Sequence, residues 1–398
     1  MGNNLSQAKT NLEATSTSSG RPNPRRKIPS NDLLKKLRSA SLRILTINAN
    51  PPDSASFKPS SMLHLSLTAS PLSPSPEPPS KIEADTEAGM AEPRWMENEA
   101  QIGENSEKYE WMYERKFRKI SGSKYLFPHD DSECRRLTVQ HYMMRWRLQR
   151  NFSAPVEPLL RKGCRVLDVG CGPAVWLIEM AQDYPASRFT GLDMVTSFFP
   201  ANPPTNCEFV QGNILSRLPF EDGSFDYVYM RFFVAALTIA QWPHALQELL
   251  RVTNSEGWIE VVDANGGIIS DMEEGAILQL RELFIHTLSA RGMDYFAGEH
   301  LRDRMALLNL DHFESHSYLI PVGSWGGRLG ALSKMNILDA IRAVVPVLDL
   351  ASGKLRRLDE VRDTLEKVER ELEIHRSYIE TFVAFGQKRQ ETLHGDQR

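Results

Sequence analysis

Residues 166–174 read Val166-Leu167-Asp168-Val169-Gly170-Cys171-Gly172-Pro173-Ala174. The apolar run is typical of a parallel strand that is covered on both faces. Two glycines spaced one residue apart allow a tight turn and a close backbone approach before a helix, whose N-terminus would then face a ligand. The stretch therefore indicates the strand and turn of a nucleotide-cofactor site, although an ordinary strand-to-helix turn can carry the same pair of glycines.

The spacing of the small residues separates two classes of cofactor. A dinucleotide fingerprint that starts at Gly170 needs a small residue at position 175, and this sequence has Val175 there, which disfavours a nicotinamide cofactor. An acid two residues before the first glycine instead resembles the D-x-G-x-G-x-G element of class I S-adenosylmethionine-dependent methyltransferases, with Ala174 in place of the third glycine. The resemblance implies S-adenosylmethionine as cofactor and a Rossmann-like α/β fold with a doubly wound, mostly parallel seven-stranded sheet.

The resemblance continues in order through the following strands. Residues 189–194 resemble the family's second strand, whose acid, Asp193, would accept hydrogen bonds from both ribose hydroxyls. Residues 207–214 resemble the third strand and its loop, where Asn213 stands in place of the usual aspartate against the adenine amino group. The cofactor-binding residues that the resemblance implies are Asp168, Gly170, Cys171, Gly172, Asp193, Met194, Asn213 and Ile214, with Met230 and Arg231 at the rim.

The flanking segments narrow the resemblance to one group. Tyr125-Leu126-Phe127-Pro128, upstream of the first strand, is similar to the entry segment of fungal methyltransferases related to the velvet-complex regulator of secondary metabolism. Residues 321–330 and 377–390 resemble late elements of the same group, so the resemblance covers residues 106–390. It implies methyl transfer to a small molecule or a protein, with a cofactor-binding regulatory protein in a nuclear complex as the alternative.

Together with helical spacing in segments such as 134–150, the resemblance implies alternating strands and helices. Strands are expected at 165–169, 188–193, 207–211, 225–230, 258–262, 312–321 and 379–387. Helices are expected at 134–150, 175–182, 240–252, 272–290, 331–350 and 355–376. We expect helices within 272–310 and 331–350 to roof the pocket. The helix at 355–376 is expected to pack on its own domain, with a short coiled coil as the alternative.

The sequence contains several candidate bases but no catalytic dyad. Methyl transfer mainly requires that the reacting pair be aligned and desolvated, so a dyad is not necessary. His141, Glu260, Asp263 and His286 are the candidates, and each has a structural role as its alternative because none has a partner at diagnostic spacing. Residues 263–267, which follow the fifth strand, are expected to form a mobile lid or a simple flexible loop.

The residues at the end of the fourth strand indicate which kinds of atom could accept the methyl group. Residues 229–232 read Tyr-Met-Arg-Phe and lack the [DN]-P-P-[YF] set that is used on adenine, cytosine or glutamine nitrogen. Those substrates are therefore disfavoured, and oxygen, sulfur and carbon acceptors remain open.

Composition sets limits on the class of protein. The chain has 398 residues, of which 41% are hydrophobic and 25% charged, enough for one large domain and a tail. A formal net charge of −4 does not predict broad nucleic-acid binding. The four cysteines form no C-x-x-C pair, so neither a metal site nor a disulfide framework is expected. No apolar run approaches the length of a membrane span.

Residues 1–105 are rich in serine and proline, first basic and then acidic, and are expected to be disordered, as are residues 391–398. The basic cluster Arg25-Arg26-Lys27 would serve as a nuclear address, a lipid-surface patch or a solvated tail. Residues 1–6 fit the myristoylation pattern M-G-x-x-x-[ST], with Gly2 as the acceptor, which would add peripheral membrane contact. We expect a cytoplasmic or nuclear protein, with membrane association as the alternative.

Overall fold

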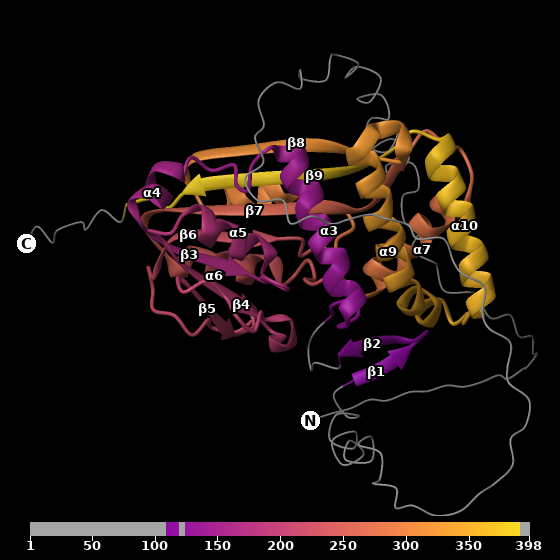
Figure 1. The fold of residues 1–398 in the computed structure, drawn as a ribbon, viewed down its shortest axis with the longest axis horizontal. Coiled ribbons are helices and arrows are strands. Elements are labelled where there is room, and N and C mark those ends of the chain that lie inside the picture. Colours follow the sequence, from indigo (N-terminus) through magenta and orange to yellow (C-terminus); the bar gives the residue numbers. More distant parts are fainter. Residues whose placement is uncertain (1–108, 119–123, 391–398) are drawn as a thin grey trace, which may run out of the picture. The chain divides into compact units, whose positions relative to one another are not determined.

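The computed structural model describes residues 109–118 and 124–390 of the chain (Figure 1). The expectations for residues 1–105, including Gly2 and the basic cluster, and for residues 391–398 lie outside the described residues. The described elements begin with a short hairpin and continue into a seven-stranded sheet with helices around it.

The sheet has the strand order β5-β4-β3-β6-β7-β9-β8. Its strands are β3 (Arg165–Val169), β4 (Arg188–Asp193), β5 (Cys207–Gln211), β6 (Phe225–Arg231), β7 (Thr253–Ser270), β8 (Asp311–Val322) and β9 (Ser377–Gln387). β5, β4, β3, β6 and β7 are parallel neighbours, whereas β9 is antiparallel to both β7 and β8. This confirms the predicted mostly parallel α/β sheet.

Helices bury both faces of the sheet because the strands are apolar on both sides. Alternate residues of β3 face opposite layers, with Val166 in one apolar cluster and Leu167 in the other. The Leu167 cluster contains α6 (Trp242–Val252) and α8 (Leu301–Ala306). The Val166 cluster contains α4 (Glu157–Lys162) and α5 (Val175–Asp183), together with α3 (Asp131–Leu148). Burial on both faces is characteristic of a parallel sheet.

β7 is much longer than the predicted strand at 258–262. Residues 263–267, expected to be a lid or a flexible loop, lie inside β7, so that prediction was wrong. β9 lies beside this stretch and pairs with it on either side of an irregularity between Ala264 and Ile268. A strand more than one hundred residues later thus pairs with β7 up to Ala264 and again from Ile268, whereas the N–H of Gly266 donates to the carbonyl of Tyr295 at 2.7 Å. Gly267 has no side chain because a Cβ there would lie 2.3 Å from the Tyr295 hydroxyl.

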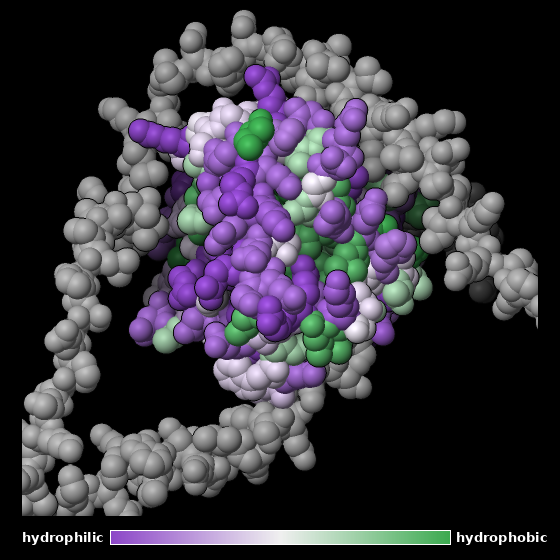
Figure 2. Space-filling model, turned by 90° about the vertical axis from the view of Figure 1, so that its right-hand side faces the viewer, coloured by the Kyte–Doolittle hydropathy of each residue, from purple (hydrophilic) through white to green (hydrophobic). Residues whose placement is uncertain are grey.

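The far ends of β7, β8 and β9 carry a group of three helices, α7 (Ala276–Ala290), α9 (Gly327–Ser352) and α10 (Leu358–Ile374) (Figure 1). Val361, Val368 and Leu372 of α10 are buried in the same apolar cluster as residues of α9 and α7. α10 thus packs on its own domain, as the first of the two alternatives predicted. The face of the molecule at this end is mainly hydrophilic, with apolar side chains scattered over it (Figure 2).

A hairpin of β1 (Tyr109–Met112) and β2 (Arg115–Arg118), which the sequence patterns did not predict, is fastened to the start of α3. Arg115 donates two hydrogen bonds to the Asp130 carboxylate, at 2.7 and 3.0 Å. Asp130 is also the N-cap of α3 and accepts from the backbone N–H of Glu133 at 2.9 Å. The hairpin therefore fixes the segment 124–130, which leads into the site.

Candidate functional site

The turn between β3 and α5 has the geometry that its glycines predicted. Gly170 and Gly172 have φ values of +71° and +52°, in the left-handed region that glycine enters without steric cost. A Cβ on Gly170 would lie 2.6 Å from the ring of Phe233, so the position also requires a close approach. Ala174, which replaces the family's third glycine, has a φ of +58° at the N-cap of α5. The backbone there still has the conformation that glycine favours.

Asp193, at the end of β4, is tied to this turn. Its Oδ2 accepts a hydrogen bond from the N–H of Gly172 at 2.9 Å, and its Oδ1 accepts from the N–H of Val195 at 2.9 Å. Burial raises the pKa of this carboxyl above its usual value, against the effect of the N–H donors. Each carboxylate oxygen has a second lone pair, so both can accept a further hydrogen bond from a ligand.

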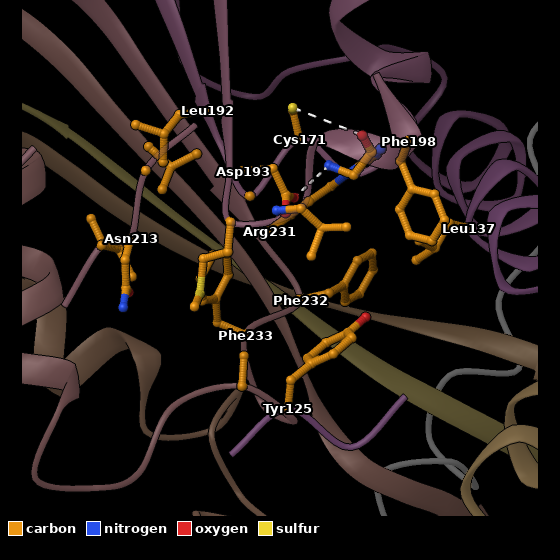
Figure 3. A pocket seen from close by; sticks show the side chains of 18 of the residues that line it. Tyr125, Leu137, Cys171, Leu192, Asp193, Phe198, Asn213, Arg231, Phe232 and Phe233 are labelled. Atoms are coloured by element: carbon orange, nitrogen blue, oxygen red, sulfur yellow. Dashed lines mark hydrogen bonds between the residues drawn. The ribbon is translucent and has the colours of Figure 1, made fainter. Parts of the chain in front are cut away.

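A cavity opens at the carboxyl ends of β3, β4, β5 and β6 (Figure 3). In Figure 3, Asp193 and Asn213 lie on the ends of neighbouring strands, and the rings of Phe232 and Tyr125 are seen among the other side chains of the lining. Eight of the ten expected cofactor residues line it: Gly170, Cys171, Gly172, Asp193, Met194, Asn213, Ile214 and Arg231. The side-chain oxygen of Asn213 accepts the N–H of Leu215 at 2.9 Å, and its amide nitrogen can donate to a ligand.

The other two expected cofactor residues lie behind this lining. Met230 is fully buried in the apolar cluster beneath α6 and does not reach the rim of the cavity. Asp168 is 1% exposed, and its Oδ1 has no hydrogen-bond partner. Burial raises the pKa of Asp168 to about 7, although the nearby Arg231 opposes the shift. A buried carboxylate oxygen without a donor is a costly feature, which a ligand with an N–H or O–H group would relieve.

The side chain of Arg231 is held in place by a hydrogen bond to His141. The Nη1 of Arg231 lies 3.2 Å from Nδ1 of His141, and Nε2 of His141 lies 2.8 Å from the Glu179 carboxylate. Because arginine can only donate, Nδ1 accepts and the ring proton sits on Nε2. Burial lowers the pKa of His141 to about 4, so the ring is neutral at pH 7. His141 lines neither this cavity nor the second one described below, which makes it a positioning residue for Arg231.

The remaining candidate bases have structural partners or lie at the surface. The Glu260 carboxylate accepts the N–H groups of Ser153 and Ala154 and the hydroxyl of Tyr227, at 2.8 to 3.0 Å. His286 is exposed on α7. Neither residue lines either cavity.

Asp263 organises the loop after β6. It accepts N–H bonds from Phe233 at 3.0 Å, Val234 at 3.3 Å and Ala264 at 2.8 Å. Burial raises the pKa of Asp263 to about 7, against the effect of these three donors. Phe232, the residue before this bonded pair, has a φ of +60°. Asp263 therefore holds a loop whose side chains face the cavities.

A second cavity lies against the first, among α3, α7, α9 and the middle of β7 and β9. The two cavities have volumes of ≈ 160 and ≈ 190 Å³, so the second is no smaller than the first. Its lining is mostly apolar, including Met143, Ile277, Phe284, Ile341 and Val344. Helices within both regions expected to roof the pocket contribute to this lining.

Four residues line both cavities: Tyr125, Leu137, Gln140 and Phe232. They come from the entry segment, from α3 and from the loop after β6. Burial raises the pKa of Tyr125 far above its usual value, so its hydroxyl stays protonated at neutral pH. The two cavities therefore adjoin at these four side chains.

Sequence reasoning singled out none of His129, Phe198 and Phe233 as site residues, although all three line the first cavity. His129 stacks on Phe198 with ring centroids 6.0 Å apart. Burial lowers the pKa of His129 to about 4, so this imidazole is neutral at pH 7. The entry segment was recognised by resemblance, but its position over the cofactor turn depends on the hairpin and the N-cap of α3.

Residues 109–118 and 124–390 contain neither a metal-binding cluster nor a membrane-spanning helix. They include no group of three or more His, Cys, Asp or Glu side chains arranged to hold a metal ion. Within the same ranges, no helix combines the length and apolar character that a membrane crossing requires.

Comparison with known proteins places the cofactor region in a family. Residues 166–257 match a family described as a methyltransferase domain. These residues run from β3 through the cofactor turn to the start of β7, and they include Asp168, Asp193, Asn213 and Arg231.

Similarity to individual proteins extends beyond that region. The chain is 24% identical over 289 residues to methyltransferase pytC of Aspergillus terreus, covering 67% of this chain and 83% of that one. It is 26% identical over 277 residues to N-methyltransferase sirN of Leptosphaeria maculans, covering 67% of this chain and 95% of that one. It is 32% identical over 144 residues to secondary metabolism regulator LAE1 of Cochliobolus heterostrophus, covering 35% and 45%.

Proposed function

Since this chain is a class I S-adenosylmethionine-dependent methyltransferase, we propose that it methylates a small molecule held in the second cavity. The observation that carries the proposal is the shared wall, in which Tyr125, Leu137, Gln140 and Phe232 line both cavities. A methyl donor in the first cavity and a methyl acceptor in the second would meet at these shared residues. The similarity to pytC and sirN, both named as methyltransferases, supports the methyl transfer itself.

The residues of the first cavity fit the cofactor. S-adenosylmethionine supplies a methyl group on a positively charged sulfur, which is open to attack by a nucleophile. Asp193 has lone pairs for the ribose hydroxyls, and the Asn213 side chain is placed for the adenine edge. Arg231 would bind the carboxylate of the methionine part, and the unpartnered Oδ1 of Asp168 would accept a hydrogen bond at the same end.

The lining of the second cavity favours an acceptor whose reacting atom is already nucleophilic when it binds, so that the protein need not remove a proton from it. Its described lining contains no carboxylate, imidazole or amine that could remove a proton. The protein's contribution would then be alignment and exclusion of water, and alignment alone is worth about 7–11 kcal/mol in favourable cases. Because sirN is named as an N-methyltransferase, nitrogen is a further candidate acceptor atom alongside oxygen, sulfur and carbon.

A regulatory role is the second candidate, favoured by the similarity to a protein named as a secondary metabolism regulator. In that role the chain would bind the cofactor and partner proteins in a nuclear complex. A cytoplasmic or nuclear location, and membrane contact through Gly2, remain predictions about residues outside the described ranges.

Incubation of the full chain with methyl-labelled S-adenosylmethionine and a fungal metabolite extract tests the proposal. We expect label in the small-molecule fraction, and we expect it to be lost with Asp193→Ala. Label only on protein would contradict the small-molecule acceptor. Cofactor binding without transfer to any extract would favour the regulatory role.

A further inference from the structure

The second cavity contains two guanidinium groups, and they differ in their partners. Arg136 is paired, because its Nε and Nη2 donate to the two oxygens of Glu133 at 2.8 and 2.6 Å. Its Nη1 donates to Asn336 at 3.3 Å, and its guanidinium lies over the ring of Phe127 at 4.8 Å. The charge and the donors of Arg136 are thus satisfied within the fold.

Arg281, on α7, has no such partner. Its Nε is buried without a hydrogen bond, and no described acid lies within ion-pair distance of it. The nearby Tyr295 supplies no negative charge, because burial raises the pKa of its hydroxyl to about 12. Glu371, which reaches the start of α7 from α10, is engaged by the N–H groups of Ala276 and Ile277. Arg281 is partly exposed, and its positive charge, without an acidic partner among the described residues, lines a mostly apolar cavity.

A second unsatisfied polar group lines the same cavity from the sheet. Thr381, on β9, is 1% exposed, and its hydroxyl oxygen has no hydrogen-bond partner. Thr381 pairs with Ala264 of β7, which also lines the cavity. Buried polar groups in folded proteins are nearly always hydrogen-bonded, so an orphan pair in one cavity points to a ligand that satisfies both.

We propose that the acceptor is a carboxylate-bearing molecule with an apolar body, whose anionic oxygens are bound by Arg281 and whose position is fixed further by the Thr381 hydroxyl. The inference rests on the proposed function, since it describes the molecule held in the second cavity. The planar guanidinium matches a carboxylate with two parallel hydrogen bonds. An anionic acceptor also complements the positive sulfur of the cofactor.

The binding of two compounds of the same shape tests this proposal. Dissociation constants of 2-naphthoate and neutral 2-naphthamide are measured on the full chain saturated with S-adenosylhomocysteine. We expect the wild type to prefer the naphthoate by about tenfold to a hundredfold, the range for charge-assisted hydrogen bonds. Arg281→Met should abolish the preference and Thr381→Val should reduce it. Arg291→Met, at the end of α7 and outside both cavities, should leave it unchanged.

The affinity for S-adenosylhomocysteine separates failure of this inference from failure of the proposed function. Equal binding of the two compounds, a preference that survives Arg281→Met, or no binding of either at millimolar concentration would overturn the inference while cofactor binding stands. Failure of the wild type to bind S-adenosylhomocysteine would overturn the proposed function itself. Unchanged cofactor affinity in Arg281→Met also shows that this variant is folded.

Discussion

The Asp193 carboxylate at the end of β4 accepts the backbone N–H of Gly172, in the turn after β3, at 2.9 Å. Two sequence motifs more than twenty residues apart are therefore joined by one hydrogen bond. The same carboxylate also accepts the N–H of Val195 at 2.9 Å, so it fixes the loop after its own strand. The acid assigned to the ribose and the glycine turn thus form one unit.

Replacing Asp193 should weaken cofactor binding. Hydrogen bonds to a charged group are worth about 1.5–3 kcal/mol each, so Asp193→Ala should lower the affinity for S-adenosylhomocysteine at least tenfold. Asp193→Asn keeps the volume and one acceptor oxygen and should lose less. Calorimetric titration measures both effects. Unchanged affinity in the alanine variant would show that Asp193 does not bind the ribose. Tighter binding of NAD than of S-adenosylmethionine would favour a dinucleotide cofactor.

Asp263→Asn should destabilise the fold and weaken cofactor binding together. The carboxylate accepts N–H bonds from Phe233, Val234 and Ala264, whereas an amide has one acceptor oxygen and turns an NH₂ group toward a donor. The expected loss in free energy of unfolding is about 1–3 kcal/mol, measured in urea. Glu274→Gln, an exposed substitution in the segment before α7, is the control. Full stability in Asp263→Asn would show that the three bonds do not hold the loop.

Gly170→Ala should cost more stability than the same change at Gly353. Both glycines have a left-handed backbone, with φ of +71° and +69°, so both variants carry a strain of about 1–2 kcal/mol. Only at Gly170 does the new methyl group meet another side chain, the ring of Phe233 at 2.6 Å. Thermal unfolding of the two variants isolates that contact. Equal losses would show that the Phe233 ring moves aside freely.

His141 should make the protein less stable in mild acid. Its pKa is about 4 in the fold and about 6.5 in the unfolded chain, so the unfolded state binds more protons between these values. Stability is therefore lost as the pH falls through this window, by about 2 kcal/mol between pH 7 and pH 5. His141→Gln cannot titrate, and it can still donate to Glu179 and accept from Arg231. The free energy of unfolding of this variant should fall less over that range than that of the wild type. An equal pH dependence in the two proteins would contradict the lowered pKa of His141.

The strands of the cofactor half could be predicted closely from the sequence. The predicted ranges 165–169, 188–193 and 207–211 coincide with β3, β4 and β5, because each segment matches a local motif of the family that the sequence resembles. The glycine spacing likewise predicted a tight turn, and the backbone of that turn is left-handed at Gly170 and Gly172. These are local properties, and local patterns are sufficient to indicate them.

Features that depend on distant pairing could not be predicted in this way. β7 continues beyond Gly266 and Gly267 because β9, from another part of the chain, pairs with it on both sides of these residues. The fully buried position of Met230 depends on α6 packing over the sheet. The isolation of Arg281 appears only when the surrounding elements are in place, because it depends on which acids are absent from its surroundings in the described structure.

The assignment of the cofactor and the acceptor to separate cavities is tested most directly by one calorimetric comparison with S-adenosylhomocysteine. Ala236 lines only the first cavity and Ala340 only the second, so Ala236→Phe and Ala340→Phe place the same ring in one chamber or the other. Our account predicts that Ala236→Phe loses most of its affinity, whereas Ala340→Phe binds as tightly as the wild type. Full affinity in Ala236→Phe together with a large loss in Ala340→Phe would contradict it.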